Sequence, residues 1–293
     1  MTRKEFIKRI TLTSLSLPLM KLAALGKIVD QSVTTKKMPL LFVGHGSPMN
    51  AILNNSFNQK WKALGKELPS PNAILVISAH WITNNATKVT AMASPKTIHD
   101  FRGFPDELFQ QQYPTPGSPE WSKETINLVQ KTHITEDFEW GLDHGTWSIL
   151  KPMFPEATLP VYQISLDYAQ PAQFHYELGK ELEALRNKGV LIIGSGNIVH
   201  NLRSLDPDAT APPAWAEDFD QTMKRFINQR AFQSVVDFQK LGPLAQKAHP
   251  TYDHFLPLLY VLGATSKKDN ISHFNDGFDL GSISMRSLLI DEN

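Results

Sequence analysis

MPLLFVGH, at residues 38–45, is the stretch that decides the fold. Its apolar residues are continuous rather than alternating, which is the pattern of a strand covered by helices on both faces. A second run of this kind occupies residues 73–80, and residues 56–68 between the two runs have a helical pattern. The three segments together predict a β-α-β unit with two parallel strands.

The rest of the chain extends this pattern. We predict buried strands at residues 159–166 and 189–196, with a helix at 171–187 between them. Further helices are predicted at 215–229, 231–240 and 254–262, followed by strands at 270–275 and 282–290 around an Asp276-Gly277 hairpin turn. The expected fold is a single α/β domain with a central, mostly parallel or mixed sheet that helices cover on both faces.

Residues 1–36 are set apart from this domain, which we place at residues 37–293. They begin with the basic sequence MTRKEFIKR and continue with a weakly apolar run at residues 10–25. This order resembles a twin-arginine export signal with lysine in place of the second arginine, and it predicts transport to the periplasm. A disordered or amphipathic extension on a cytoplasmic protein is the alternative. The run is shorter than the roughly 18 apolar residues that a membrane span needs.

Composition narrows the classes of ligand. The 29 basic and 29 acidic residues cancel, so no net field favours nucleic acid or an anionic membrane. The sequence has no cysteine, which excludes disulfides, thiolate metal ligands and iron–sulfur clusters. Any metal must therefore be bound by carboxylates and by some of the ten histidines. We expect a small ligand rather than a macromolecule.

Two histidines stand at equivalent ends of predicted strands. His45 ends the first run and His80 ends the second. Because ligands of open α/β sheets bind at the carboxyl ends of parallel strands, both imidazoles are expected at one sheet edge, where they could share a metal. The alternative is that each only forms hydrogen bonds at the end of its strand.

Three more histidines have settings that are typical of a site. His200 follows the glycine-containing segment 194–196, for which a phosphate loop or a plain turn is the alternative; the full dinucleotide-binding motif is absent. His254 lies next to Asp253, which could instead be a helix N-cap. His144 lies between Asp143 and Gly145, and Asp143 could simply satisfy it in a turn.

Several motifs, in this order, resemble the DODA-type branch of the class III (LigB-like) extradiol aromatic ring-opening dioxygenases. They are HGSPM (45–49), SAHW (78–81), DFRGFP (100–105), LDHGTW (142–147), GNIVHNL (196–202) and HP with DHF (249–250 and 253–255). The resemblance extends from about residue 38 to residue 290. It implies ring opening of a small catechol-type aromatic by O₂ without an organic cofactor.

The resemblance also implies roles for single residues. It implies a divalent metal, Fe²⁺ or Zn²⁺, bound by His45, His80 and His254, with His200 and His144 as acid/base and substrate-orienting groups. The wider superfamily has a glutamate where this chain has His254, and an all-histidine site suits zinc as well as iron. The candidate substrate-binding residues are Ser47, Trp81, Arg102, Tyr113 and His249.

One motif departs from the family pattern. The family segment often has tyrosines where this chain has His99 and Arg102, which suggests a substrate other than DOPA with an acidic group for Arg102 to pair with. A zinc-dependent hydrolase, or a non-catalytic metal-binding protein on the same scaffold, is the alternative function. The sequence leaves the oligomeric state open.

Overall fold

The structure is a computed structural model that describes residues 37–292. The export signal and the domain boundary predicted at residue 36 fall on residues outside this range, and both stay predictions. No helix within residues 37–292 has the length and apolar character needed to cross a membrane.

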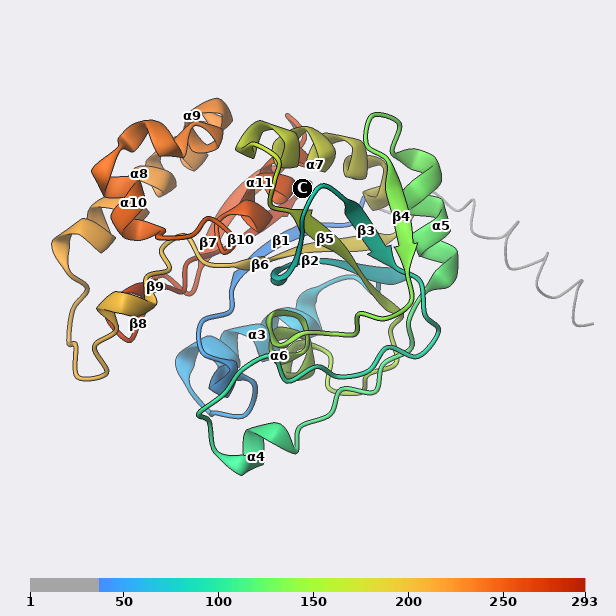
Figure 1. The fold of residues 1–293 in the computed structure, drawn as a ribbon, viewed down its shortest axis with the longest axis horizontal. Coiled ribbons are helices and arrows are strands. Elements are labelled where there is room, and N and C mark those ends of the chain that lie inside the picture. The colour runs from blue at the N-terminus through green and yellow to red at the C-terminus, as the bar shows by residue number, and fades with distance from the viewer. Residues whose placement is uncertain (1–36, 293) are drawn as a thin grey trace, which may run out of the picture. The chain divides into compact units, whose positions relative to one another are not determined.

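A central sheet of eight strands organises the described chain, in the order β4-β3-β5-β2-β6-β1-β10-β7 (Figure 1). The middle of the sheet consists of parallel strands: β1 (Leu40–Gly44), β2 (Ala73–Thr83), β5 (Val161–Asp167) and β6 (Val190–Gly196). The flanking strands are β3 (Thr87–Thr90), β4 (Ile134–Asp137), β7 (Asn270–Phe274) and β10 (Ser287–Asp291). Antiparallel pairing of β10 with β1 and β7, and of β3 with β5, makes the sheet mixed.

Helices cover both faces of the sheet, as the continuous apolar strands predict. Helices α3 (Ser56–Glu67) and α6 (His144–Met153) lie on one side, and α7 (Ala172–Arg186) and α11 (Leu256–Gly263) lie on the other (Figure 1). Successive side chains of β1 enter different cores, because side chains alternate across a strand: Leu41 packs with the first helix pair and Leu40 with the second. The predicted α/β class is confirmed. The remaining helices are α4 (Asp106–Phe109), α5 (Pro119–Leu128), α8 (Ala214–Asn228), α9 (Phe232–Val236) and α10 (Pro243–Ala248).

The prediction of a simple C-terminal hairpin is wrong. Strands β7 and β10 do pair, but the chain does not turn back at Asp276-Gly277; it continues into a second small hairpin, β8 (Phe278–Asp279) with β9 (Ile283–Ser284). The turn of that hairpin contains Leu280 and Gly281, both with positive φ. Ile283 forms a β-bridge with His200, so long-range pairing draws this connection towards the carboxyl ends of the strands.

Two further differences have local causes. Strands β3 and β4 are missing from the prediction because each has only four residues, TKVT and ITED, without a continuous apolar run. The helix expected at residues 231–240 is divided into α9 and a 3₁₀ turn at Phe238–Leu241.

Candidate active site

The strand ends bring the histidines of distant segments together. His45 follows β1, His80 lies in β2, and His200 lies just beyond β6. Strand β6 lies between β1 and β2 in the sheet, so the two histidines of the predicted β-α-β unit stand on either side of it. The expectation of a common edge is confirmed.

Two glycines allow the surrounding loops to approach this edge. A Cβ atom at Gly196 would lie 2.2 Å from the carbonyl oxygen of His254, and a Cβ atom at Gly145 would lie 2.5 Å from Ser78 Oγ. No side chain fits at these distances. Gly196 therefore admits the His254 segment against β6, and Gly145 admits the start of α6 against β2.

A cavity of about 340 Å³ opens at this edge. Five imidazoles and the carboxylate of Asp100 line it, and most of the other lining residues are apolar. The described lining residues are His45, Gly46, Ser47, Pro48, His80, Asp100, Phe101, Arg102, Phe104, His144, His200, Leu202, Leu205, His254, Leu280 and Ile283. A larger groove of about 700 Å³ beside α3 and α6 has no histidine among its described lining residues. The smaller cavity is therefore the candidate active site.

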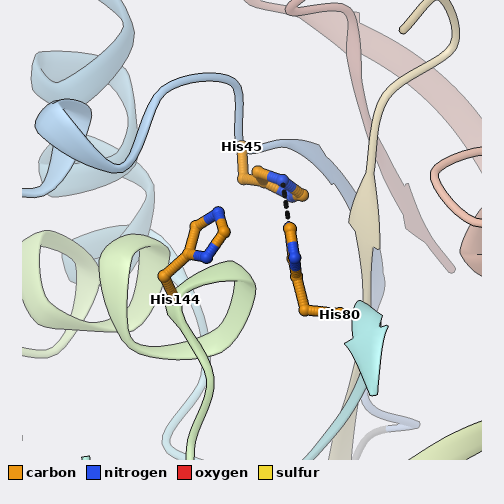
Figure 2. Close-up of side chains that lie close together, drawn as sticks. All are labelled: His45, His80 and His144. Carbon is orange, nitrogen blue, oxygen red and sulfur yellow. Dashed lines mark hydrogen bonds between the residues drawn. The ribbon is translucent and has the colours of Figure 1, made fainter. Parts of the chain in front are cut away.

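His45, His80 and His144 form a candidate metal site. Each offers a ring nitrogen, and these atoms all lie within 4.8 Å of one another. The three side chains converge from the end of β1, the end of β2 and the first residue of α6 (Figure 2). Nε2 of His45 and Nε2 of His80 are 3.2 Å apart.

The polar contacts of the two Nδ1 atoms bear on the positions of the ring protons of His45 and His80. Ser195 Oγ donates its single proton to the carbonyl oxygen of Gly145. Ser195 Oγ must therefore accept the hydrogen bond from Nδ1 of His45, which lies 3.0 Å away. Nδ1 of His80 lies 3.3 Å from Oδ2 of Asp100. His45 therefore carries its proton on Nδ1 and directs the lone pair of Nε2 towards Nε2 of His80, and the Asp100 carboxylate favours the same tautomer for His80.

This arrangement fits a divalent cation. With both rings protonated on Nδ1, the two Nε2 lone pairs would face each other at 3.2 Å and bind a cation between them; without a cation, the two Nε2 atoms lie at hydrogen-bond distance. Two nitrogens that bind one ion, each at about 2.1 Å, are separated by about 3.0–3.4 Å for bond angles between square and tetrahedral. The donor set of neutral imidazoles is one that zinc and iron both accept.

Ring spacing distinguishes the two candidates for a third ligand. Imidazoles that hold one ion through Nε2 have ring centroids about 5 Å apart. The His254 centroid lies 5.2 Å from that of His45 and 4.9 Å from that of His80, and the latter two are 5.1 Å apart. The His144 centroid is only 3.8 Å from that of His80. This spacing favours His254, whereas the ligand-atom distances place His144 in one group with His45 and His80, and His254 in another.

His200, Asp253 and His254 form a second group whose ligand atoms lie within 4.8 Å of one another. The rings of His200 and His254 are stacked, with centroids 3.4 Å apart and an interplanar angle of 4°. Asp253 Oδ2 contacts Nδ1 of His254. The N-cap alternative for Asp253 is wrong, because α11 begins after Phe255 and has no side-chain cap; the carboxylate orients His254 instead.

The environment keeps four imidazoles of the cluster, those of His45, His80, His200 and His254, neutral at pH 7. Burial, reinforced by the neighbouring imidazoles, lowers the pKa of His45 and of His254 well below the usual value. Burial likewise lowers the pKa of His80 to about 3 and that of His200 to about 4. A neutral imidazole is the form that binds a metal or accepts a proton.

Two carboxylates near His144 have different functions. Asp143 is the N-cap of α6 and accepts hydrogen bonds from Ser78 Oγ, the Thr146 backbone N–H and Trp140 Nε1, so it does not satisfy His144 as the turn alternative supposes. Asp100 Oδ2 lies 3.0 Å from Nδ1 of His144. Burial raises the pKa of the Asp100 carboxyl, but the hydrogen bond and charge of His144 outweigh this effect and keep the pKa below its usual value.

The predicted substrate-binding residues occupy different environments. Ser47 and Arg102 line the cavity. Trp81 stacks on Trp140, with ring centroids 5.8 Å apart. Tyr113 is buried and donates its hydroxyl to the Phe154 carbonyl oxygen. These assignments stay predictions, and only the first two residues are among the described lining of the cavity.

His249, the remaining candidate, faces the aromatic core. Its Nε2 donates to the Ile198 carbonyl oxygen at 2.7 Å, and Phe219, Phe238 and Phe255 surround its ring. It is not among the described residues that line the cavity. Its substrate-binding role also stays a prediction.

Sequence reasoning missed most of the apolar wall. Leu202, Leu205, Leu280 and Ile283 line the cavity, and Leu202 is 62% exposed. They lie in irregular segments and the small hairpin, where no periodicity distinguishes them. Asp100 was also given no role, although a carboxylate at the first position of the DFRGFP motif was a signal that could have identified it.

Comparison with known proteins gives a consistent picture. The family described as the catalytic LigB subunit of aromatic ring-opening dioxygenase matches residues 34–280. The 4,5-DOPA dioxygenase extradiol of Escherichia coli (strain K12) is 42% identical over 271 residues, which cover 90% of this chain and 98% of the relative. The protein of the same name from Beta vulgaris is 35% identical over 252 residues, covering 84% of this chain and 94% of the relative.

A solved structure agrees with the fold. The crystal structure of an uncharacterized protein from Escherichia coli K12 aligns with a TM-score of 0.75 at 38% sequence identity. The alignment covers 86% of this chain and 99% of the other.

Proposed function

The chain belongs to the LigB family of extradiol aromatic ring-opening dioxygenases, and from this premise we propose that His45, His80 and His254 hold one divalent metal for the opening of a catechol-type ring by O₂. The observation that carries the proposal is the pair of Nε2 atoms of His45 and His80, which face each other at 3.2 Å, the separation of two nitrogens that bind one ion. His254 completes the triangle of ring centroids. His144 is the alternative third ligand.

The metal would supply a Lewis acid that lowers the pKa of a catechol hydroxyl and, if it is iron, a redox centre for O₂. We propose iron for the oxygen chemistry, although three imidazoles bind zinc equally well. Oδ2 of Asp100 faces the Nδ1 atoms of His80 and His144, and Oδ2 of Asp253 contacts Nδ1 of His254, so both carboxylates lie against the Nδ1 side of the rings.

His200 is proposed to move the substrate proton. Its ring is neutral at pH 7 and lies stacked against His254, so it can accept a proton from a catechol hydroxyl near the ligands and return it later. His144 lines the opposite part of the histidine cluster, where it can orient the second oxygen. Phe101 and Phe104 line the same cavity and can pack on the substrate ring while excluding water.

Arg102 is proposed to bind an acidic group of the substrate. It is exposed at the cavity and is the one lysine or arginine among the described lining residues. The opposite wall contains Leu202, Leu205 and Leu280. A catechol with a carboxylate on its side chain would place the charge at Arg102 and its apolar portion against these leucines.

The charge of Arg102 gives the first testable prediction. Arg102→Gln should raise KM about fivefold for catechols that carry a carboxylate, because an exposed ion pair contributes about 1 kcal/mol at most. KM for uncharged catechols should not change. Steady-state O₂ uptake with matched acidic and neutral catechols measures both values. Equal effects on the two substrate classes would disprove charge recognition.

The proposed chemistry is tested on the whole protein. Metal-free protein should regain O₂ consumption with a catechol panel when Fe²⁺ is added under anaerobic conditions before air is admitted, and the product should contain an opened ring. Zn²⁺ should bind without supporting O₂ uptake. Hydrolytic activity with Zn²⁺ and no oxygen consumption with either metal would instead support the hydrolase alternative. Metal binding without any turnover would support a binding protein.

A further inference from the structure

Asp100 makes contacts from both of its carboxylate oxygens to neighbouring parts of the site. Oδ1 accepts a hydrogen bond from the backbone N–H of His144 at 2.8 Å. Oδ2 lies 3.3 Å from Nδ1 of His80 and 3.0 Å from Nδ1 of His144. The side chain of Asp100 is 19% exposed, so water competes only weakly for these contacts. One oxygen thus anchors the chain, while the other faces two imidazoles.

The chemistry of the carboxylate restricts the tautomers of both rings. An ionised carboxylate only accepts hydrogen bonds, so each ring nitrogen that faces it must carry a proton. Nδ1 of His144 is buried without a well-aligned hydrogen bond to any described residue, Asp100 included, and Oδ2 of Asp100 is the carboxylate oxygen that it faces, at 3.0 Å. Asp143, the other nearby carboxylate, is already engaged by Ser78, Thr146 and Trp140. Asp100 is therefore the group that determines where the protons of these rings reside.

We propose that Asp100 is a positioning residue which holds His80 and His144 together in the Nδ1–H tautomer, so that both rings offer the Nε2 lone pair. Through His80 it prepares the metal site, and through His144 it prepares a proton acceptor beside that site. The inference rests on the proposed function only in taking His80 as a metal ligand. The tautomers can be measured in the metal-free protein, where the Asp100 carboxylate acts on His80 in competition with Nε2 of His45, 3.2 Å from Nε2 of His80.

The substitution Asp100→Asn separates the two duties of the carboxylate. The amide oxygen can still accept the hydrogen bond from the His144 backbone N–H, so the contact between residue 100 and the start of α6 is preserved. The amide NH₂ then faces the two Nδ1 atoms and, as a donor, favours rings protonated on Nε2 instead. A ring with a proton on Nε2 cannot bind the metal through that atom. Affinity for Co²⁺, followed by its visible absorption against a competing chelator, should fall about 10–100-fold.

Asp137→Asn is the matched control. Asp137 also accepts backbone hydrogen bonds, from Glu139 and Trp140, and pairs with Lys88, but it has no contact with the clustered imidazoles among the described residues. Its Co²⁺ affinity should equal that of the unchanged protein. Normal Co²⁺ binding by Asp100→Asn would overturn the proposal, and so would an equal loss in both variants.

Tautomers are measured directly by ¹⁵N NMR of histidine-labelled, metal-free protein at pH 7.5 or above. His80→Gln and His144→Gln assign the two rings. The unchanged protein should show Nδ1–H for both, which requires no variant to fold, and Asp100→Asn should move both towards Nε2–H. Observing Nε2–H for either ring in the unchanged protein would overturn the inference. If the unchanged protein instead shows the expected tautomers but binds no Co²⁺, the proposed metal function fails while the inference on Asp100 stands.

Discussion

His254→Ala is expected to lose its divalent metal, whereas His144→Ala is expected to keep it. Removing an outer-shell partner costs about 10–100-fold in metal affinity, and removing a ligand should cost more than this. The rings of His45, His80 and His254 have the spacing of three ligands around one ion, with centroids 4.9–5.2 Å apart. The 3.8 Å between the ring centroids of His144 and His80 is shorter than the roughly 5 Å expected for two rings that bind one ion through Nε2, although their ring nitrogens lie within 4.8 Å of each other.

Metal content after dialysis and Co²⁺ affinity measure this difference. His175→Ala is the matched control, because His175 is equally buried but bonds to Tyr260 between α7 and α11. It should retain the metal if it folds, and circular dichroism of all three variants checks folding. The reverse pattern, with metal lost in His144→Ala and kept in His254→Ala, would show that the third ligand is His144.

Replacing His200 should strongly reduce turnover without loss of the bound metal. A positioned general base contributes about 10²–10⁴-fold to rate, so kcat of His200→Ala should fall by that factor. The ring is stacked parallel to His254 at 3.4 Å, an arrangement in which both rings cannot direct a nitrogen at one ion. Metal affinity should therefore stay within about tenfold of the unchanged protein, a smaller change than the loss of a ligand produces.

Stopped-flow O₂ consumption and metal analysis on the same preparation test this expectation. A His200→Gln variant preserves bulk beside His254 and separates loss of the base from collapse of the stack. Both variants should show low kcat with metal present. Metal loss in both would make His200 a ligand, and unchanged kcat in both would remove it from proton transfer.

The core strands were predictable because their signal is local. Residues 40–44, 73–77 and 190–194 are continuously apolar, and the structure buries all of β1 and β6. The spatial order of the strands was not predictable from such runs. Strand β6 enters between β1 and β2, and this insertion places Ser195 against the ring of His45.

Parts of the chain with weak local patterns were predicted less well. Strands β3 and β4 are short and polar at three of their four positions, so pairing with neighbouring strands forms them rather than hydrophobic periodicity. The hairpin of β8 and β9 is held in place by the β-bridge between Ile283 and His200. The Asp276-Gly277 pair predicted a turn between two strands, but tertiary contacts extend the chain into the additional β8–β9 hairpin.

The sequence by itself determined the chemical possibilities: a cysteine-free α/β chain with histidines at strand ends, whose motifs indicated an oxygenase family. These properties follow from residue type and local periodicity. Only the tertiary structure decided which nitrogen of each imidazole faces its neighbours, because a tautomer depends on the hydrogen-bond partner behind the ring. Those partners, Ser195 and Asp100, lie 150 residues from His45 and 20 residues from His80, and packing alone brings them into contact.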